Sequence, residues 1–118
     1  MKTYITEKFT FEAAHRLVGL LKQNEEIHGH SFEVQVTISG EPDKIFGWVI
    51  PRQEFRTRVS PFIKQLDHRY LNEIMELTTA EMIARHLYLR LMDKKLPDSV
   101  KLESVKVSKV GMSAEVRG

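Results

Sequence analysis

Hydrophobic and polar residues alternate along two stretches of the N-terminal third of the chain. In residues 2–15 (KTYITEKFTFEAAH) the apolar positions Ile5, Phe9 and Phe11 share one face. In residues 31–40 (SFEVQVTISG) every second residue is apolar: Phe32, Val34, Val36 and Ile38. Alternation of this kind predicts two strands, each with one buried face. Residues 16–27, which lie between them, are expected to form a loop.

Two later stretches have the spacing of helices instead. Residues 51–66 (PRQEFRTRVSPFIKQL) place apolar side chains on one helical face, and Pro61 is expected to make that helix irregular. Residues 78–92 (TTAEMIARHLYLRLM) carry a stripe of Ile83, Leu87 and Leu91. Thr78 followed by Glu81 fits a capping box at the start of this second helix.

The C-terminal part returns to alternation. Residues 100–110 (VKLESVKVSKV) and 112–117 (MSAEVR) predict two strands joined by a short turn at Gly111. In the first of these strands, Glu103 and Lys109 are expected on the same face as the valines between them. The order strand, strand, helix, helix, strand, strand predicts an α+β domain over residues 1–118, a four-stranded antiparallel sheet with both helices on one face.

Composition narrows the possible functions. The chain has 118 residues, 42% of them hydrophobic, and no cysteine, which excludes disulfides, thiolate metal sites and cysteine nucleophiles. Its net charge is +2 and its basic residues are scattered, so we expect no nucleic-acid partner. The polar N-terminus predicts no secretory signal, and no apolar run reaches the roughly 18 residues of a membrane span. We therefore expect a cytoplasmic protein.

Candidate chemistry centres on histidines. His28 and His30 flank Gly29, and residues two apart in a strand point to the same side. His15 ends the first predicted strand, which could lie beside the second. Three neutral imidazoles that converge on one ion form a catalytic zinc arrangement with a position left for water or substrate. The alternative is that His28 and His30 are simply two histidines on a strand.

A carboxylate and an imidazole are adjacent at Asp67 and His68. Such a pair suits proton transfer, because the carboxylate orients the imidazole and stabilises its charged form. It is equally consistent with a capping arrangement after a helix. His86, in the middle of the second predicted helix, is interpreted as structural.

Four motifs occur in one order along the chain: FEAAHRL, IHGHSFEV, LDHRYLN and TTAEMIA. With them the sequence resembles the 6-pyruvoyl-tetrahydropterin synthase family, which includes the 6-carboxy-tetrahydropterin synthase of queuosine biosynthesis. The likeness spans about residues 3 to 110. It implies the tunnelling fold (T-fold), assembled from trimeric barrels into a homohexamer with active sites between subunits. Family substrates are reduced pterins, typically dihydroneopterin triphosphate.

The resemblance also implies roles for single residues. Zinc would be bound by His15, His28 and His30. Asp67 and His68 match the proton-transfer pair of the family, and Thr79 matches a residue that helps to hold the pterin ring.

The sequence departs from the family where the catalytic cysteine is expected, four residues before His28. Asn24 occupies that position, and an amide has no useful basicity. Glu25, three residues before His28, resembles a branch in which a glutamate replaces the cysteine. That branch cleaves dihydroneopterin to 6-hydroxymethyl-dihydropterin and glycolaldehyde in folate synthesis. Glu25 is thus the candidate base and Glu26 the second choice; a solvated loop carboxylate is the alternative.

Two further departures concern the substrate. The glutamate with which the family anchors the pterin edge is replaced by Lys109, whose ammonium only donates hydrogen bonds. We expect Lys109 to pair with Glu103 or Glu115, or to meet an anionic group of the ligand. The segment GWVIPR, with Pro51 and Arg52, stands where the family commonly has G-x-V-x-D-F.

Taken together, the sequence predicts a zinc-dependent lyase that acts on a reduced pterin, with dihydroneopterin side-chain cleavage as the first choice. The alternatives are 6-carboxy- or 6-pyruvoyl-tetrahydropterin synthesis, which the missing cysteine disfavours. A catalytically silent zinc-containing homologue that binds another small molecule also remains open.

Overall fold

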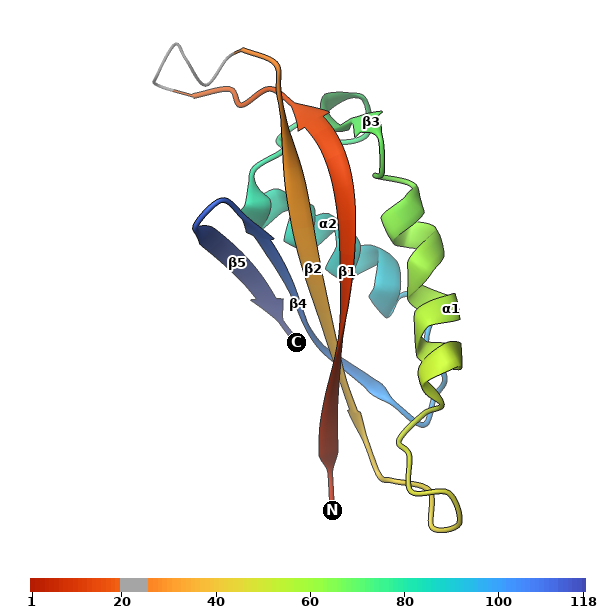
Figure 1. Cartoon of the computed structure of the whole chain (residues 1–118). Coiled ribbons are helices and arrows are strands. Elements are labelled where there is room, and N and C mark those ends of the chain that lie inside the picture. Colours follow the sequence, from red (N-terminus) through yellow and green to blue (C-terminus); the bar gives the residue numbers. More distant parts are fainter. Residues whose placement is uncertain (20–25) are drawn as a thin grey trace.

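The computed structural model of the chain describes residues 1–19 and 26–118, and its helices and long strands follow the predicted order. The elements, shown in Figure 1, are β1 (Thr3–His15), β2 (His28–Gly40), α1 (Arg52–Lys64), β3 (Arg69–Tyr70), the 3₁₀ turn η2 (Leu71–Glu73), α2 (Ala80–Met92), β4 (Lys101–Lys109) and β5 (Met112–Arg117). Within these described ranges, no helix is long and apolar enough to span a membrane.

The sheet has the strand order β3-β1-β2-β4-β5. The four long strands pair antiparallel, as predicted. The expected count of four strands was one too few, because β3 adds a short parallel pairing of Arg69 and Tyr70 with Ala13 and Ala14. A strand of two residues is too short to show an alternation of polar and apolar positions in the sequence. The short strand β3 forms because its backbone pairs with the edge of β1.

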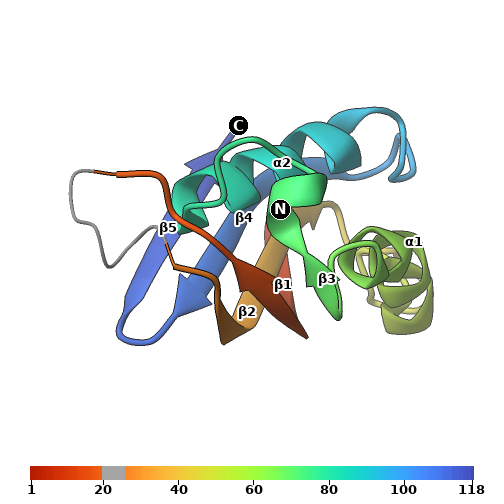
Figure 2. The same ribbon diagram turned by 90° about the horizontal axis from the view of Figure 1, so that it is seen from above.

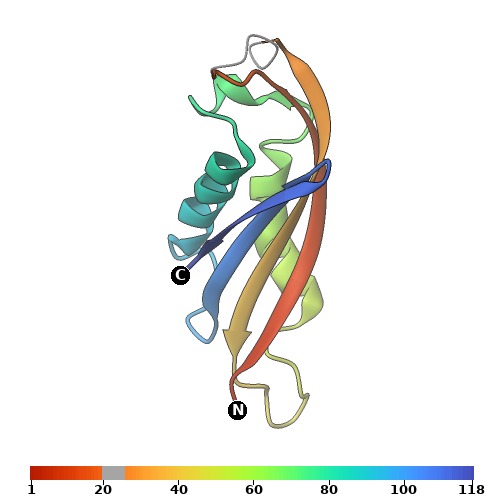
Figure 3. The ribbon, with the colours of Figure 1, turned by 90° about the vertical axis from the view of Figure 1, so that its left-hand side faces the viewer.

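Both helices cover one face of the sheet (Figure 2 and Figure 3). The residues of β1 and β2 that point to the opposite face are mostly polar. The buried face is formed by the alternating apolar positions that the sequence indicated, with Phe11 and Phe32 stacked at a centroid distance of 4.8 Å. Helix α2 contributes Ile83, Leu87 and Leu91 to this core, as expected from its stripe. Burial of these aliphatic and aromatic side chains is the main source of stability.

Helix α1 contributes Phe55, Val59 and Ile63 to the core and contains Pro61, which faces solvent. Helix α1 also supplies the cationic partners of Glu7, a carboxylate on the helix-facing side of β1. Arg52 and Arg56 lie 2.9 Å and 2.6 Å from the carboxylate oxygens of Glu7. Burial alone would raise the pKa of Glu7, but the hydrogen bonds from the two arginines outweigh it and hold the pKa below its ordinary value.

Helix α2 begins one residue later than the predicted capping box required. Its N-cap is Thr79, whose hydroxyl accepts a hydrogen bond from the backbone N–H of Met82 at 3.2 Å. The prediction of Thr78 as the cap was wrong, because Thr78 is buried and its carbonyl serves another partner. Glu81 still lies in the first turn, where a negative charge is favourable.

Strand β4 contains a bulge that reverses one predicted side-chain direction. Its register with β2 shifts between Thr37 and Ile38, and Glu103 has no partner on β2. Glu103 therefore lies on the polar face, where it accepts a hydrogen bond from Ser39 and pairs with Lys2. The expectation that Glu103 shares the face of Lys109 was wrong, because one extra residue in a strand reverses the alternation.

Candidate metal centre

Three histidines converge at the end of the sheet where β1 finishes and β2 begins. His15 lies directly opposite His28 in the β1–β2 ladder, and His30 lies opposite Ala13. The three ring centroids are 4.6, 4.7 and 5.1 Å apart, and one nitrogen from each ring lies within 4.8 Å of the others. The strand parity that placed His28 and His30 on one side thus also brings them to His15.

In two of these rings, those of His15 and His28, Nδ1 is hydrogen-bonded to a backbone carbonyl. His15 Nδ1 donates to the carbonyl of Thr78 at 2.8 Å, and His28 Nδ1 donates to the carbonyl of Glu26 at 2.9 Å. This arrangement leaves Nε2 of each ring as the unprotonated atom. In metal centres such hydrogen bonds fix the ring orientation and the tautomer of the ligand.

His15 is completely buried, and its Nε2 has no hydrogen-bond partner among the residues that the structure describes. A buried polar atom without a partner is costly, so its presence here calls for an explanation. A metal ion bound between the three rings would supply the missing partner. Three nitrogen ligands match the protein donor set of a catalytic metal centre, whose fourth position is taken by water or substrate. The residues present therefore fit a metal ion.

The electrostatics of the cluster favour neutral imidazoles. Burial lowers the pKa of His15 to about 4, and the charge of Lys109 acts in the same direction. Burial also lowers the pKa of His30, again with a contribution from Lys109. Because a metal ion binds the deprotonated nitrogen, rings that are neutral at physiological pH are ready to act as ligands.

Asp67 and His68 form a second group of functional side chains. His68 Nδ1 lies 3.0 Å from Asp67 Oδ2, while Asp67 Oδ1 accepts a hydrogen bond from the backbone N–H of Glu12 at 2.9 Å. The bond from Glu12 and that from His68 hold the pKa of Asp67 below its ordinary value. His68 has φ of 57°, a left-handed conformation that costs free energy in a non-glycine residue, and its N–H donates to the Glu12 carbonyl.

The sheet separates this pair from the three histidines within one chain. The backbone N–H of His68 donates to Glu12, and the cavity that His68 borders includes Ala13 and His30 as well as the cross-strand partners Glu12 and Ser31. Both alternate with Ala13 and His30 along their strands, so they face the polar side of the sheet. The histidine cluster faces the helices. One chain therefore carries the metal cluster and the Asp67–His68 pair on opposite faces.

The remaining predicted residues lie as follows. Glu25 and Asn24 are outside the described residues. Glu26 is exposed and contributes its carbonyl to His28. The hydroxyl of Thr79 caps α2.

Lys109 does not form the predicted ion pairs. Glu103 pairs with Lys2, and Glu115 pairs with Arg117 at 2.7 Å. The carboxylate of Glu81, in the first turn of α2, raises the pKa of Lys109, while burial lowers it more strongly.

Sequence reasoning missed one residue that shapes the cluster. Asn72, in the 3₁₀ turn after β3, accepts a hydrogen bond from the backbone N–H of Arg16 at 2.8 Å and donates to its carbonyl at 2.9 Å. Arg16 directly follows His15, so this amide holds the chain where a metal ligand emerges from β1. A lone asparagine in a turn carries no local signal for such a role.

Comparisons with known proteins agree with this architecture. The sequence profile of the 6-pyruvoyl tetrahydropterin synthase family matches residues 4–116. The solved structure of the 6-pyruvoyl tetrahydropterin synthase of Caenorhabditis elegans superposes with a TM-score of 0.84 at 24% identity, covering 100% of this chain and 96% of that one. At that identity the likeness shows the fold, which is the T-fold that the resemblance implied.

Two curated relatives are similar in sequence over most of their length. The dihydroneopterin monophosphate aldolase of Pyrococcus furiosus is 39% identical over 87% of this chain and 86% of its own. The 6-carboxy-5,6,7,8-tetrahydropterin synthase of a Synechocystis species is 32% identical over 93% of this chain and 88% of its own.

Proposed function

Because the chain belongs to the 6-pyruvoyl tetrahydropterin synthase family, we propose that it is a zinc-dependent lyase that cleaves the side chain of a dihydroneopterin. The observation that carries this proposal is the buried, unpartnered Nε2 of His15, which converges with His28 and His30. A site of three imidazole nitrogens suits zinc, whose bonds to histidine are about 2.0–2.1 Å long.

Cleavage rather than another reaction of the family is supported by two observations. The chain has no cysteine, so a thiolate base is unavailable, and Glu25 lies three residues upstream of His28, with Glu26 beside it. The Pyrococcus relative is named as an aldolase of dihydroneopterin monophosphate. Both favour carbon–carbon cleavage over 6-carboxy- or 6-pyruvoyl-tetrahydropterin synthesis.

The proposed reaction is a retro-aldol cleavage. Glu25, or His68 oriented by Asp67, removes the proton from the hydroxyl on the second carbon of the side chain. The bond between the first and second side-chain carbons then breaks, and its electron pair moves into the imine of the dihydropterin ring. A proton returned to the first carbon restores the ring and yields 6-hydroxymethyl-dihydropterin and an aldehyde. Zinc, when bound, supplies Lewis-acid stabilisation of negative charge on the side-chain oxygens.

The residues named for this reaction require more than one subunit. The Asp67–His68 pair and the histidine cluster lie on opposite faces of one sheet, so we propose that a second copy of the chain completes each site. The open edges of the sheet, along β5 and most of β1, provide surfaces for pairing between copies. We therefore propose the homohexameric assembly, a dimer of trimers, that the family resemblance implies.

Product analysis tests the proposed function. The zinc-loaded protein should convert dihydroneopterin, or its monophosphate, to 6-hydroxymethyl-dihydropterin, identified by chromatography against a standard. Glu25→Gln should slow the reaction by about 100-fold or more, the usual size of a general-base effect. Formation of a 6-carboxy or 6-pyruvoyl product would favour the synthase alternatives. Binding without turnover of either substrate would favour the silent homologue.

A further inference from the structure

Lys109 ends β4 beside a tight turn in which Val110 and Gly111 both have positive φ. The β2–β4 register pairs Val34 with Val107 and Glu33 with Ser108. Extending it by one step places Lys109 beside Phe32. Phe32 shares its face of β2 with His30 and packs edge-to-face on His30 and His15, at centroid distances of 5.8 and 5.6 Å. Lys109 is thus on the metal-binding face.

The charge of Lys109 acts directly on the histidine cluster. The strand register places Lys109 beside Phe32, whose ring packs on both His15 and His30. Lys109 is partly buried, and burial is the main cause of its own lowered pKa. Its environment therefore disfavours a positive charge unless an acceptor is present.

The described residues, 1–19 and 26–118, supply no strong acceptor for this ammonium. Among the residues that the structure describes, no carboxylate forms an ion pair with Lys109, and Glu81 acts on it only through its field. Lys101 and Lys106, on the same strand, lie on the other face of the sheet. Keeping a partly desolvated ammonium beside the three histidines costs free energy unless a ligand accepts its hydrogen bonds.

We propose that Lys109 is a specificity-determining residue that binds the phosphate of a phosphorylated dihydropterin. The proposal rests on the function proposed above and names its substrate class. An ammonium donates hydrogen bonds and carries a point charge, so it suits a phosphate monoester. It cannot accept from the N–H donors of a pterin ring edge. A neutral substrate would leave Lys109 without a partner, whereas a phosphorylated one would satisfy it.

Binding measurements with a matched pair of ligands test this assignment. Neopterin and neopterin monophosphate differ only in the phosphate. The carbon–nitrogen double bond next to their side chain is part of an aromatic ring and is a poor acceptor for the electron pair released by cleavage, so neither ligand should be consumed. Calorimetric titration of the zinc-loaded wild type should show roughly 10- to 100-fold tighter binding of the monophosphate, the range expected for one charge-assisted contact. Lys109→Met should abolish that preference, and Lys109→Arg should retain it. Lys101→Met, an exposed lysine on the same strand, is the matched control and should behave as wild type.

Charge reversal sharpens the test. Lys109→Glu should reject the monophosphate, because its carboxylate would repel the phosphate. Circular dichroism of each variant verifies folding. An equal preference for the monophosphate in wild type and Lys109→Met would overturn the proposal, because the metal or another group would then bind the phosphate. The absence of any preference in wild type would overturn it as well.

The outcome is separable from that of the proposed function. Phosphate selectivity that depends on Lys109, without any cleavage of dihydroneopterin monophosphate, would support the site and defeat the lyase. Cleavage with equal efficiency of the phosphorylated and unphosphorylated substrates by wild type would support the lyase and defeat the role of Lys109.

Discussion

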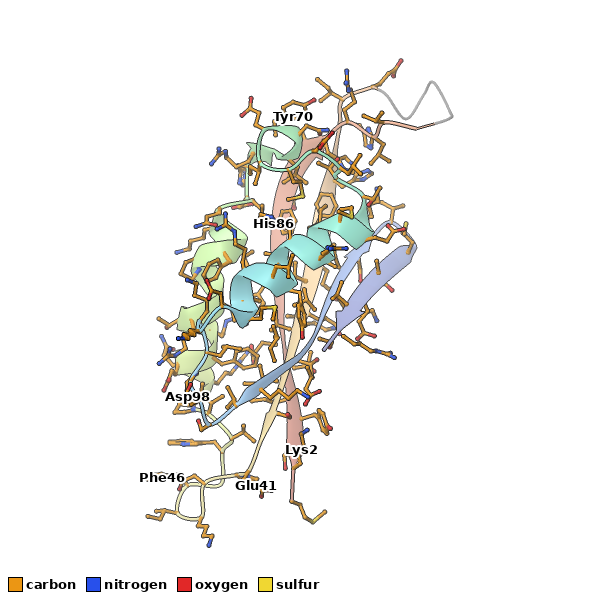
Figure 4. The ribbon with its side chains drawn as sticks, turned by 180° about the vertical axis from the view of Figure 1, so that it is seen from behind. Lys2, Glu41, Phe46, Tyr70, His86 and Asp98 are labelled. Carbon is orange, nitrogen blue, oxygen red and sulfur yellow. The ribbon has the colours of Figure 1, made fainter. Side chains whose placement is uncertain are left out.

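Asn72 holds the backbone of Arg16 through both groups of its side-chain amide, with hydrogen bonds of 2.8 and 2.9 Å. The hydroxyl of Thr78 donates a further hydrogen bond of 3.3 Å to the backbone carbonyl of Arg16. The neighbouring residue, His15, donates through Nδ1 to the Thr78 carbonyl. The start of α2 and the turn after β3, which follows the labelled Tyr70 in Figure 4, therefore jointly fix the position of one candidate metal ligand.

Asn72→Ala should weaken zinc binding by about 10- to 100-fold, the usual cost of losing support around a metal ligand. Asn72→Asp keeps the acceptor for the Arg16 N–H and loses the donor, so its affinity should be intermediate. Competition with a chromogenic chelator measures both. Gln65→Ala, which removes an exposed amide at the end of α1, is the control. Unchanged zinc affinity in Asn72→Ala would show that the amide only stabilises the turn.

Purified protein should contain one zinc per chain, and the metal should depend on the histidine cluster. His28→Ala should lose the metal in elemental analysis, whereas His86→Ala, which removes a histidine of α2, should retain it. Free zinc at about 100 times its dissociation constant should raise the free energy of unfolding of the metal-free wild type by about 2.7 kcal/mol, because it binds only the folded state. The same addition should leave His28→Ala unchanged. Retention of stoichiometric zinc by His28→Ala would place the metal elsewhere.

Mixed oligomers should recover activity that neither parent possesses. His28→Ala destroys the metal cluster and His68→Ala destroys the proton-transfer pair, so each alone should be inactive. If each site combines the cluster of one copy with the pair of another, random co-assembly restores about a quarter of the sites. Co-expression of the two variants followed by the product assay measures this recovery.

A mixture of His28→Ala and His30→Ala is the matched control for the mixed oligomers, because both lesions affect the same cluster and no intact site can form. Light scattering on the wild type should show an oligomer at micromolar concentration. A stable monomer that is fully active would contradict the shared site.

His86 should make the protein less stable as the pH falls. Burial is the main cause of its lowered pKa in the folded chain, and the charge of Arg90 adds to it. Glu76 and Arg85 border the same cavity as His86. The unfolded chain, with an ordinary histidine pKa of about 6.5, binds more protons below that pH, so the free energy of unfolding decreases from there toward the folded pKa.

His86→Gln should remove this contribution. Urea unfolding of the metal-free wild type and variant at about pH 7.5 and about pH 5.5 spans the relevant window. The wild type should lose more stability between the two conditions than His86→Gln does. The comparison within metal-free protein keeps the titration of the histidine cluster common to both. An equal loss in the two proteins would show that His86 does not contribute.

Local patterns in the sequence determined most of the fold. Alternation in β1 and β2 and the stripe in α2 predicted those elements and their buried faces, because side-chain direction repeats every two residues in a strand and about every 3.6 in a helix. The same parity placed His28 and His30 on one side of β2. Absence of cysteine and the position of Glu25 likewise follow from the sequence alone.

Tertiary structure decided the features that depend on residues far apart in the chain. The acceptor for His15 is a carbonyl 63 positions away, and Asn72 reaches Arg16 across 56. The bulge in β4 moved Glu103 to the polar face, because register depends on the partner strand as well as on the strand itself. It left Lys109 facing the metal cluster without the carboxylate that the alternation predicted. Non-local hydrogen bonds and strand register have no local sequence signature, so only the folded chain could reveal them.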